Sequence, residues 1–483
     1  MQLTAIQRIL GLLLMLFSVT MLPPVGVSYW YADNTQNAFF MAFALTFFIG
    51  MFCWLPARTY RKELRLRDGF VVVVLFWTAL SMVSALPFML AENPHMSFTN
   101  AVFESVSGFT TTGATVIVGL DQLPQSILYY RQQLQFLGGM GVVVLAVAIF
   151  PMLGIGGMQL YRAETPGPMK DNKLTPRITE TARALWYIYL GLTIACATAY
   201  WLAGMSLFDA IGHSFSTIST GGFSTHDASM GHFNSALIDA IAIVFMLLGG
   251  INFAIHFMVW RQFDIKLYWR DAELRGFFTI IAAVIAITTV VLLITGRYPN
   301  FWDALRYGTF QVVTMITGTG FLTADFSVWP LFLPPLLITI GFIGGCAGST
   351  AGGMKVVRIL LLYKQGLREI KRLIHPSAII PVKIGERSLP DRVVEAVWGF
   401  SALYITSFVV LSLALMATGL DMVAAFSGVA TCLNLVGPGL GVVATTFVAV
   451  SDTGIWILSF AMLLGRLEVF TLLVILSPAF WRR

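Results

Sequence analysis

Four short stretches rich in Gly, Thr and Ser carry the groups that could bind a cation. They cover residues 110–114, 218–223, 317–321 and 434–439. Gly permits backbone conformations that turn carbonyl oxygens towards a common axis, and a ring of carbonyls can replace the water shell of a dehydrated K⁺. None of the four stretches contains a carboxylate, which a calcium-selective ring would carry. The stretches therefore predict coordination of a monovalent cation by backbone oxygens, with K⁺ before Na⁺.

A short, half-apolar run precedes each stretch and predicts a helix. The runs are Phe98–Gly108, Leu207–Thr217, Trp302–Ile316 and Asp421–Leu433, and residues that favour helix starts lie near their beginnings, namely Asn100, Asp209, Asp303 and Asp421. Such a helix is about 20 Å long at 1.5 Å per residue, so it enters a membrane but cannot cross it. Four helix C-termini that converge from one side favour a cation, because each carries partial negative charge.

The composition places these elements in a membrane. Of 483 residues, 57% are hydrophobic and only 11% are charged, against roughly 25% charged in soluble domains. This balance excludes a cytosolic enzyme, a nucleic-acid-binding module and a disordered chain. Ten stretches approach the roughly 20 apolar residues that a spanning helix needs: 9–27, 38–56, 69–90, 127–154, 184–204, 234–258, 277–296, 329–363, 394–417 and 454–479.

The basic residues predict the orientation of these spans. If both termini are cytosolic and the spans alternate, the cytosolic segments hold 26 of the 30 Lys and Arg residues, as the positive-inside rule requires. The other four are Arg131, Arg297, Arg306 and Arg466. No cleavage site follows the first apolar run, which therefore predicts a retained helix. The four Cys are far apart in apolar surroundings and show no zinc-site spacing.

The order span, short helix, Gly-containing turn, span occurs four times after the first two spans. We therefore expect an all-α integral membrane protein with about ten transmembrane helices, in which two N-terminal helices precede four pseudo-symmetric helix–pore loop–helix repeats around one pore. The expected divisions are 1–68, 69–154, 155–258, 259–363 and 364–483, with the two N-terminal helices and a basic loop in the first and one repeat in each of the others.

Two features inside the predicted spans are candidates for a gate. The eighth span is interrupted by residues 344–353, which contain five Gly, and helix interiors disfavour Gly; a loop inside the membrane is expected, with a Gly-rich packing face as the alternative. Arg466 lies near the middle of the last span, where an ionisable residue is a functional candidate. Its alternative role is an ion pair with Glu468 or with a neighbouring helix. Arg131 is expected to pair near the outer surface.

Residues along nearly the whole chain match one family. The matching stretches include 107–115, 135–148, 158–168, 221–229, 343–350, 437–441 and 465–471. With these the chain resembles the Trk/Ktr/HKT superfamily of potassium transporters, and within it the TrkH-type transmembrane subunit of bacterial Trk uptake systems. The resemblance implies that the four turns form one K⁺ filter, which by position falls on Thr111, Thr112, Gly113, Ser219, Thr220, Gly221, Gly318, Thr319, Gly320, Leu435, Val436 and Gly437.

The resemblance also implies a gate and partners. The Gly-rich loop is expected to obstruct the pore below the filter with Arg466 as a positive barrier beside it, which gives the gate residues Gly344, Gly345, Gly348, Ser349, Thr350, Gly352, Gly353, Lys355 and Arg466. A cytosolic nucleotide-binding regulatory subunit (TrkA-type) is the expected partner, together with a homodimer in the lipid bilayer of a bacterial inner membrane. No nucleic-acid partner is expected, and no nucleotide motif follows a predicted strand, so this chain is expected to bind K⁺ but no nucleotide.

Three classes of function remain in competition. A gated K⁺ pore needs only the four turns and a gate. A symporter that couples K⁺ to H⁺ or Na⁺ needs a titratable group in the path, for which Glu104 and Glu468 are the candidates. An integral-membrane enzyme is disfavoured, because the chain lacks a metalloprotease motif, a nucleophile elbow and paired carboxylates within a span.

Overall fold

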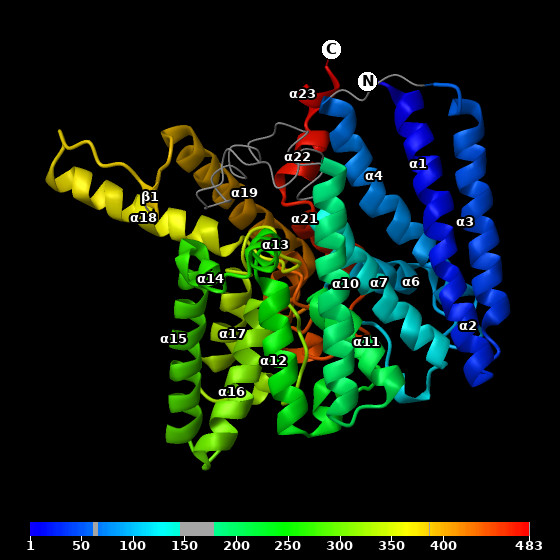
Figure 1. Ribbon diagram of the computed structural model, residues 1–483, viewed down its shortest axis with the longest axis horizontal. Helices are drawn as coiled ribbons and strands as arrows, with labels where there is room; N and C mark the ends of the chain where they lie inside the picture. Colours follow the sequence, from blue (N-terminus) through cyan, green and yellow to red (C-terminus); the bar gives the residue numbers. More distant parts are fainter. Residues whose placement is uncertain (61–65, 145–177, 386, 483) are drawn as a thin grey trace.

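The described part of the chain is a bundle of helices, as expected for an all-α membrane protein. The computed structural model describes residues 1–60, 66–144, 178–385 and 387–482. Within these ranges the only strands are the short antiparallel pair β1 (Lys383–Ile384) and β2 (Arg387–Ser388). The N-terminus and the last helix, α23 (Pro478–Trp481), lie at the same edge of the molecule (Figure 1), which agrees with termini on one side of the membrane.

The first two spans pack closely against each other at one edge of the bundle (Figure 1). The first is continuous through α1 (Leu3–Ser18), η1 (Val19–Met21) and α2 (Leu22–Tyr31), and the second is α3 (Gln36–Ala57). Gly11 and Gly50 face each other where α1 and α3 cross, and a Cβ built on either residue would lie closer than 3.0 Å to the backbone oxygen of the other. Small residues allow this approach, which strengthens van der Waals packing between membrane helices.

The remaining helices repeat one order four times. The first set is α4 (Leu66–Ser84), α5 (Leu86–Leu90), α6 (Phe98–Phe109), η2 (Leu120–Gln122) and α7 (Gln125–Val144), and the second is α10 (Ile178–Leu202), α11 (Leu207–Ile218), η4 (Ser229–Phe233), α12 (Ala236–Gly250) and α13 (Phe253–Gln262). The third is α14 (Lys266–Arg270), α15 (Ala272–Ile294), α16 (Phe301–Ile316), η5 (Phe326–Val328), α17 (Leu333–Gly341) and α18 (Val356–Ile374). The fourth is α19 (Asp391–Met416), α20 (Met422–Leu433), η6 (Gly441–Val443), α21 (Asp452–Arg466) and α22 (Phe470–Leu476).

The four short helices α6, α11, α16 and α20 match the predicted half-helices to within a residue or two at each end. Each begins with a cap residue whose side-chain oxygen accepts a hydrogen bond from a backbone N–H in the first turn. The caps are Ser97, Ser206, Asn300 and Asp421. Three of these caps precede the acidic or amide residue that the sequence singled out, and Asp421 is itself a cap. The caps satisfy N–H groups that have no partner within the helix, and they fix where each half-helix starts.

Some of the ten predicted spans are broken helices. Six described helices are long and apolar enough to cross a membrane, and two bent pairs raise the number to at most eight. The predicted span 234–258 is broken between α12 and α13 with a bend of 98°, and 454–479 is broken between α21 and α22 with a bend of 114°. The predicted span 329–363 is interrupted after Gly341, as the Gly content indicated, and resumes at Val356. The second half of span 127–154 lies outside the described residues.

Each unpredicted break has its own backbone geometry. At the first, Asn252 leaves the helix and caps α13, because its Oδ1 accepts from the N–H of Ala254 at 2.8 Å. At the second, Glu468 and Val469 adopt φ of 51° and 54°, in the left-handed region that non-Gly residues seldom occupy. Gly250 precedes the first break and Gly465 lies near the second, but the apolar run continues past each Gly, which is why a continuous span was predicted. The two breaks lie beside the Gly-rich segment described below.

Candidate functional site

All four half-helices end in the same backbone turn. The residue that follows the C-terminal cap of each half-helix has positive φ; these residues are Thr111, Thr220, Gly318 and Leu435. The residue two positions further along also has positive φ and is always Gly: Gly113, Gly222, Gly320 and Gly437. The residue between them donates its N–H to the carbonyl five positions earlier, with N···O distances of 2.8 to 2.9 Å for Thr112, Gly221, Thr319 and Val436. This is a Schellman-type ending, which satisfies carbonyls at the helix C-terminus.

The repeated turn corrects the predicted register of the second stretch. Gly222, and not Gly221, occupies the position of Gly113. Gly113 and Gly222 both have φ near 80°, and each follows the residue whose N–H donates to the carbonyl five positions earlier. Ser219 is the helix cap of α11 and corresponds to Thr110. The equivalent set in the second turn is therefore residues 220–222. The expected sets 111–113, 318–320 and 435–437 fall in one register without correction.

The four turns meet in a closed ring. A Cβ built on Gly113 would lie closer than 3.0 Å to the carbonyl oxygen of Gly221 in the next turn. The same relation joins Gly222 to Thr319, Gly320 to Val436, and Gly437 back to Thr112. Each turn thus touches the next, and the fourth touches the first. Residues at these Gly positions must lack a Cβ, because any side chain would displace a carbonyl of the neighbouring turn.

Glycines in the span that follows each half-helix allow this close packing. A Cβ on Gly138 of α7 would meet the carbonyl of Phe109, and one on Gly465 of α21 would meet that of Leu433, in both cases closer than 3.0 Å. A Cβ built on Gly249 of α12 would lie 3.0 Å from the carbonyl oxygen of Ile218. In three of the four sets the spans therefore press directly on the C-terminal ends of the half-helices.

Gln135 of α7 supports the second turn from behind. Its Nε2 donates to the carbonyl of Gly221 at 2.5 Å, and its Oε1 accepts from the N–H of Phe223 at 3.1 Å. Both atoms of this buried amide are thereby matched to backbone groups on either side of Gly222. The sequence stretch that contains Gln135 was part of the family match, but the role of this side chain was not predicted.

A buried ion pair supports the segments that leave the first and second turns. Arg131 of α7 contacts Glu104 of α6 with an Nε···Oε1 distance of 2.8 Å, and both side chains are at most 1% exposed. Glu104 also accepts from the hydroxyl of Thr115 and the N–H of Val116, and Arg131 donates to the carbonyl of Ser224. The expected partner of Arg131 is thus found, and it ties two turns together.

Loss of this ion pair is expected to destabilise the fold. The substitution Glu104→Gln leaves the Arg131 charge buried without its partner, which costs about 3–5 kcal/mol in the free energy of unfolding. Glu369→Gln is the matched control, because Glu369 pairs with Arg372 while about half exposed, and such pairs contribute at most about 1 kcal/mol. Thermal denaturation in detergent measures both variants. Equal midpoints for the two would contradict the stabilising role of the buried pair.

The Gly-rich segment between α17 and α18 is an irregular loop pressed against the turns, as the sequence predicted. A Cβ on Gly352 would meet the carbonyl of Asn434, and one on Gly344 would meet that of Gly352, in both cases closer than 3.0 Å. The hydroxyl of Thr350 lies 3.0 Å from the carbonyls of both Ile218 and Gly249. The loop therefore contacts the second and fourth half-helix ends through backbone and hydroxyl groups.

Two anchors that the sequence did not reveal fix this loop on its side away from the turns. The N–H of Cys346 donates to the carbonyl of Gly250, and the N–H of Phe253 donates to that of Gly348, so the loop is paired with the break between α12 and α13. Glu273 of α15 accepts from the N–H groups of Ala347 and Val357 at 2.8 and 3.2 Å. Glu273 is 1% exposed. No local motif distinguishes it from an ordinary helix-start carboxylate.

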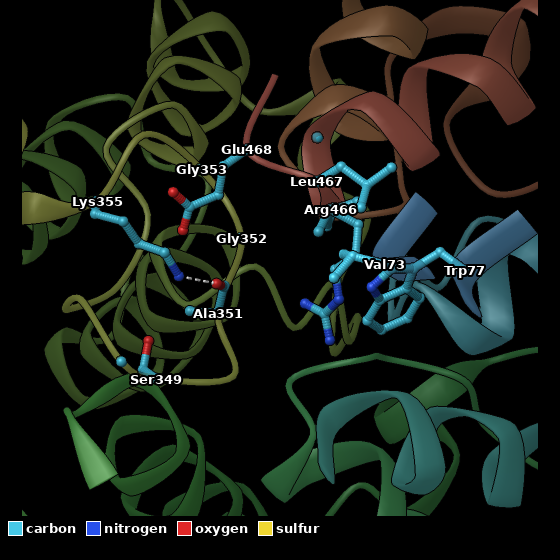
Figure 2. A pocket seen from close by; sticks show the side chains of 13 residues that line it. Val73, Trp77, Ser349, Ala351, Gly352, Gly353, Lys355, Arg466, Leu467 and Glu468 are labelled. Carbon is cyan, nitrogen blue, oxygen red and sulfur yellow. Dashed lines mark hydrogen bonds between the residues drawn. The ribbon is translucent and has the colours of Figure 1, made fainter. Parts of the chain in front are cut away.

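A small cavity lies between the loop and the end of α21. Its volume is about 40 Å³, room for only a few water molecules. Leu435 of the fourth turn lines it, together with Val73 and Trp77 of α4, the loop residues Gly348, Ser349, Ala351, Gly352, Gly353 and Lys355, and the residues 465–468. Figure 2 shows the loop on one side and Arg466 with Trp77 on the other. The cavity brings all the predicted gate segments together.

Arg466 links the loop to the first repeat. One terminal nitrogen donates to the carbonyl of Thr350 at 3.1 Å, and the other donates to that of Gly138 at 3.2 Å. The guanidinium lies 5.2 Å from the centre of the Trp77 ring and the residue is 7% exposed. Among the described residues, no carboxylate forms an ion pair with it, and its Nε has no hydrogen-bond partner. Its positive charge at the cavity is therefore not neutralised by an ion pair within those residues.

The alternative role predicted for Arg466, an ion pair with Glu468 or with a neighbouring helix, is not found among the described residues. Glu468 pairs with Arg358 of α18, with an Nη2···Oε2 distance of 2.7 Å, because the left-handed turn after Arg466 directs the two side chains to different neighbours. Lys355 occupies the other side of the cavity, where its ammonium donates to the carbonyl of Ala351 (Figure 2). The cavity thus has a basic side chain on each wall, Arg466 on one and Lys355 on the other, and the carboxylate of Glu468 also lines it.

Comparison with known proteins identifies the family. A family model described as "Cation transport protein" and named TrkH matches residues 35–483. The Trk system potassium uptake protein TrkH of Vibrio parahaemolyticus is 57% identical over 484 residues, and that of Escherichia coli K12 is 54% identical over 482, with 100% of both chains covered in each case. The crystal structure of the potassium transporter TrkH from Vibrio parahaemolyticus matches with a TM-score of 0.93 and 55% identity over 100% of both chains. The chain is therefore a multi-pass membrane protein that belongs to the TrkH family of cation transport proteins.

Proposed function

We propose that this chain is a K⁺ pore that carries K⁺ into the cell through the ring of four turns. The observation that supports it is the closure of the ring, in which Gly113, Gly222, Gly320 and Gly437 each contact the carbonyl-bearing residue of the next turn. Four helix C-termini end at this ring and favour a positive charge there. The transported ion is K⁺, in keeping with the names of the relatives as potassium uptake proteins. The ion moves down its electrochemical gradient.

Residues 111–113, 220–222, 318–320 and 435–437 are the proposed filter, with coordination by backbone carbonyls. Thr112, Gly221, Thr319 and Val436 occupy equivalent positions, and two of the four have no hydroxyl. Side-chain oxygens therefore cannot form a complete ring at this level, whereas the backbone supplies one carbonyl from each turn. Ser219 is left out of the filter, since it caps its half-helix.

The proposed gate is the Gly-rich loop with Arg466. The loop contacts Asn434 and Ile218 at the half-helix ends, and the cavity beside it holds no more than a few waters. A hydrated cation does not fit through such a space, so conduction requires the loop and Arg466 to move apart. The two hydrogen bonds from Arg466 to Thr350 and Gly138 hold this closed arrangement.

We propose a cytosolic regulatory subunit that binds nucleotide as the controlling partner, as the Trk-system names of the relatives suggest. The basic residues Lys364, Lys371 and Arg372 of α18 belong to the available surface, since this helix extends sideways from the bundle (Figure 1). Arg368 of the same helix is buried and pairs with Asp391. A homodimer in a bacterial inner membrane, with both termini cytoplasmic, completes the proposal. The chain acts as a transporter and not as an enzyme.

No observation on the described residues favours the symporter over the pore. Of its two candidate titratable groups, Glu104 is fixed by Arg131 and Glu468 is paired with Arg358. Both carboxylates are therefore engaged by a guanidinium, which does not suit a group that must bind and release an ion in each transport cycle.

Flux of ⁸⁶Rb⁺ into liposomes that contain this protein alone distinguishes the two functions. The pore predicts uptake that follows the imposed voltage, since 100 mV is worth about 2.3 kcal/mol per charge, and that does not change when a pH gradient is added. Empty liposomes and excess unlabelled K⁺ serve as controls. Uphill accumulation driven by the pH gradient at zero voltage would contradict the pore.

A further inference from the structure

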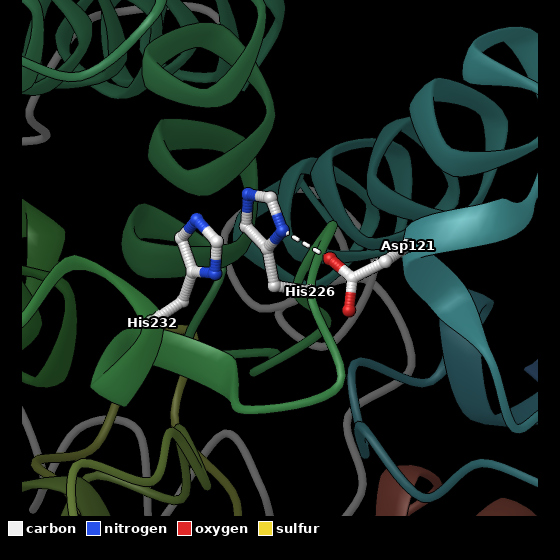
Figure 3. Close-up of side chains that lie close together, drawn as sticks. All are labelled: Asp121, His226 and His232. Carbon is white, nitrogen blue, oxygen red and sulfur yellow. Dashed lines mark hydrogen bonds and ion pairs between the residues drawn. The ribbon is translucent and has the colours of Figure 1, made fainter.

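Three side chains that are typical metal ligands meet on the face where the half-helices begin, which we name the outer face. Asp121 belongs to η2, His226 follows the second turn, and His232 belongs to η4 (Figure 3). One ligand atom from each lies within 4.8 Å of those of the other two. The two imidazole rings stack with centroids 3.5 Å apart and an angle of 2° between their planes. We propose that Asp121, His226 and His232 bind one Zn²⁺ per chain.

The donor set suits this ion. Zn²⁺ is bound by imidazole nitrogens and carboxylate oxygens at about 2.0–2.2 Å, and sites with three protein ligands leave a fourth position to water. Asp121 and His232 are exposed and His226 is partly exposed, so an ion from solution reaches all three. Alkali cations such as K⁺ are a poor match for imidazole, and this site is therefore separate from the carbonyl ring.

A second carboxylate orients the central histidine. Nδ1 of His226 faces Asp121 at 2.5 Å, and Nε2 lies 3.4 Å from Oδ1 of Asp209. With Zn²⁺ on Nδ1, the Nε2–H would face Asp209, which is the carboxylate–histidine–metal arrangement that supports many zinc sites.

The two loops that carry the ligands are held in place before any ion binds. The N–H groups of Gly119 and Leu120 both donate to Oδ1 of Asp227 at 3.1 Å, and the N–H of Asp227 donates to Oδ2 of Asp121 at 3.4 Å. This reciprocal contact fixes the loop after the first turn against the loop after the second. Little conformational freedom is lost on binding, which favours affinity.

Entry of the ion requires two local changes. The contact of 2.5 Å between His226 and Asp121 must open to roughly 3.3 Å, the ligand–ligand distance of a tetrahedron with bonds of about 2.0 Å. The ring of His232 must also rotate out of its parallel stack on His226, because the lone pair of an imidazole nitrogen lies in the ring plane and two parallel planes do not meet at one ion. Asp121 and His232 are exposed, so both movements leave the core undisturbed. Bound Zn²⁺ would then join the first and second repeats directly outside the ring, in place of a hydrogen bond.

Titration of Zn²⁺ into the purified full-length protein in detergent, after treatment with a chelator, tests the site. We expect one ion per chain by isothermal titration calorimetry, and binding at least tenfold weaker in His232→Gln and in Asp121→Asn. Both substitutions lie on exposed side chains, so the variants are expected to fold, which gel filtration checks. His95→Gln is the matched control, because His95 is also exposed on the outer face but lies outside the cluster, and its affinity should equal that of the unchanged chain.

A second readout reports the ligands directly. Co²⁺ in place of Zn²⁺ should give the intense visible absorption of a four-coordinate site, and this band should be absent from His232→Gln and retained in His95→Gln. Absence of Zn²⁺ binding, or binding that the cluster variants leave unchanged, would overturn the proposal. Neither readout depends on ion flux, so the outcome is independent of whether the chain conducts K⁺.

Discussion

Gly222→Ala is expected to reduce K⁺ flux at least tenfold and to weaken the preference for K⁺ over Na⁺. The new Cβ would lie closer than 3.0 Å to the carbonyl oxygen of Thr319, and the backbone would keep a φ of 79° that Ala disfavours by about 1–2 kcal/mol. The carbonyl of the third turn must therefore move or rotate. Because each turn contacts the next, the displacement disrupts one of the four contacts that close the ring.

Gly119→Ala separates the two causes. Gly119 has nearly the same φ, 76°, but nothing lies within 4 Å of its Cβ position. The control thus carries a similar backbone strain without the overlap, and its flux and its K⁺ over Na⁺ preference should stay within about twofold of the unchanged chain. Rb⁺ and Na⁺ fluxes into liposomes, normalised to protein incorporated, measure both variants. Similar flux and selectivity in the two would contradict the assignment of Gly222 to the filter.

The half-helices and the turns that follow them were predictable because their signals are local. Cap residues, a short apolar run and a Gly-containing stretch recur four times, and the structure has the half-helices within a residue or two of the predicted positions. The Gly-rich loop was predictable for the same reason, since five Gly within residues 344–353 are incompatible with a stable helix. The all-α membrane fold follows from the composition.

The register of the second turn was not predictable from one sequence. Gly221 and Gly222 are adjacent, and the preceding residues allow either to be matched to Gly113. Only the backbone decides, through the left-handed φ of Gly222 and the hydrogen bond from the N–H of Gly221 to the carbonyl of Ser216. The sequence shows where a turn occurs, whereas its conformation depends on the carbonyls that the neighbouring turns present.

The two broken spans were missed because long-range contacts produce them. Hydropathy continues across residues 251–252 and 467–469, and the Gly residues that precede each break, Gly250 and Gly465, are also compatible with close packing of a continuous membrane helix. The first is stabilised by the Gly-rich loop, through the hydrogen bond from Phe253 to Gly348, and the second by the ion pair between Glu468 and Arg358. Pairwise contacts of this kind override local helix preference, and they also explain why Glu273 and Gln135 were not singled out.

Arg466→Ala is expected to raise Rb⁺ flux through the protein alone at least tenfold, the opposite direction to the filter variant. The guanidinium stands at the cavity below the ring and is 7% exposed, so water screens it little. A unit charge about 4 Å away repels a cation by about 4 kcal/mol at an effective dielectric constant of 20. Ala removes this barrier together with the two hydrogen bonds that hold Thr350 and Gly138.

Arg466→Lys distinguishes charge from geometry in this gate. Lys keeps the positive charge but cannot donate from a planar fork to two carbonyls at once. If the electrostatic barrier dominates, flux through Arg466→Lys stays near that of the unchanged chain while Arg466→Ala conducts. If the hydrogen bonds to Thr350 and Gly138 dominate, both variants conduct, because the loop is released in each. Unchanged or lower flux in a folded Arg466→Ala chain would remove Arg466 from the gate and leave the obstruction to the loop alone.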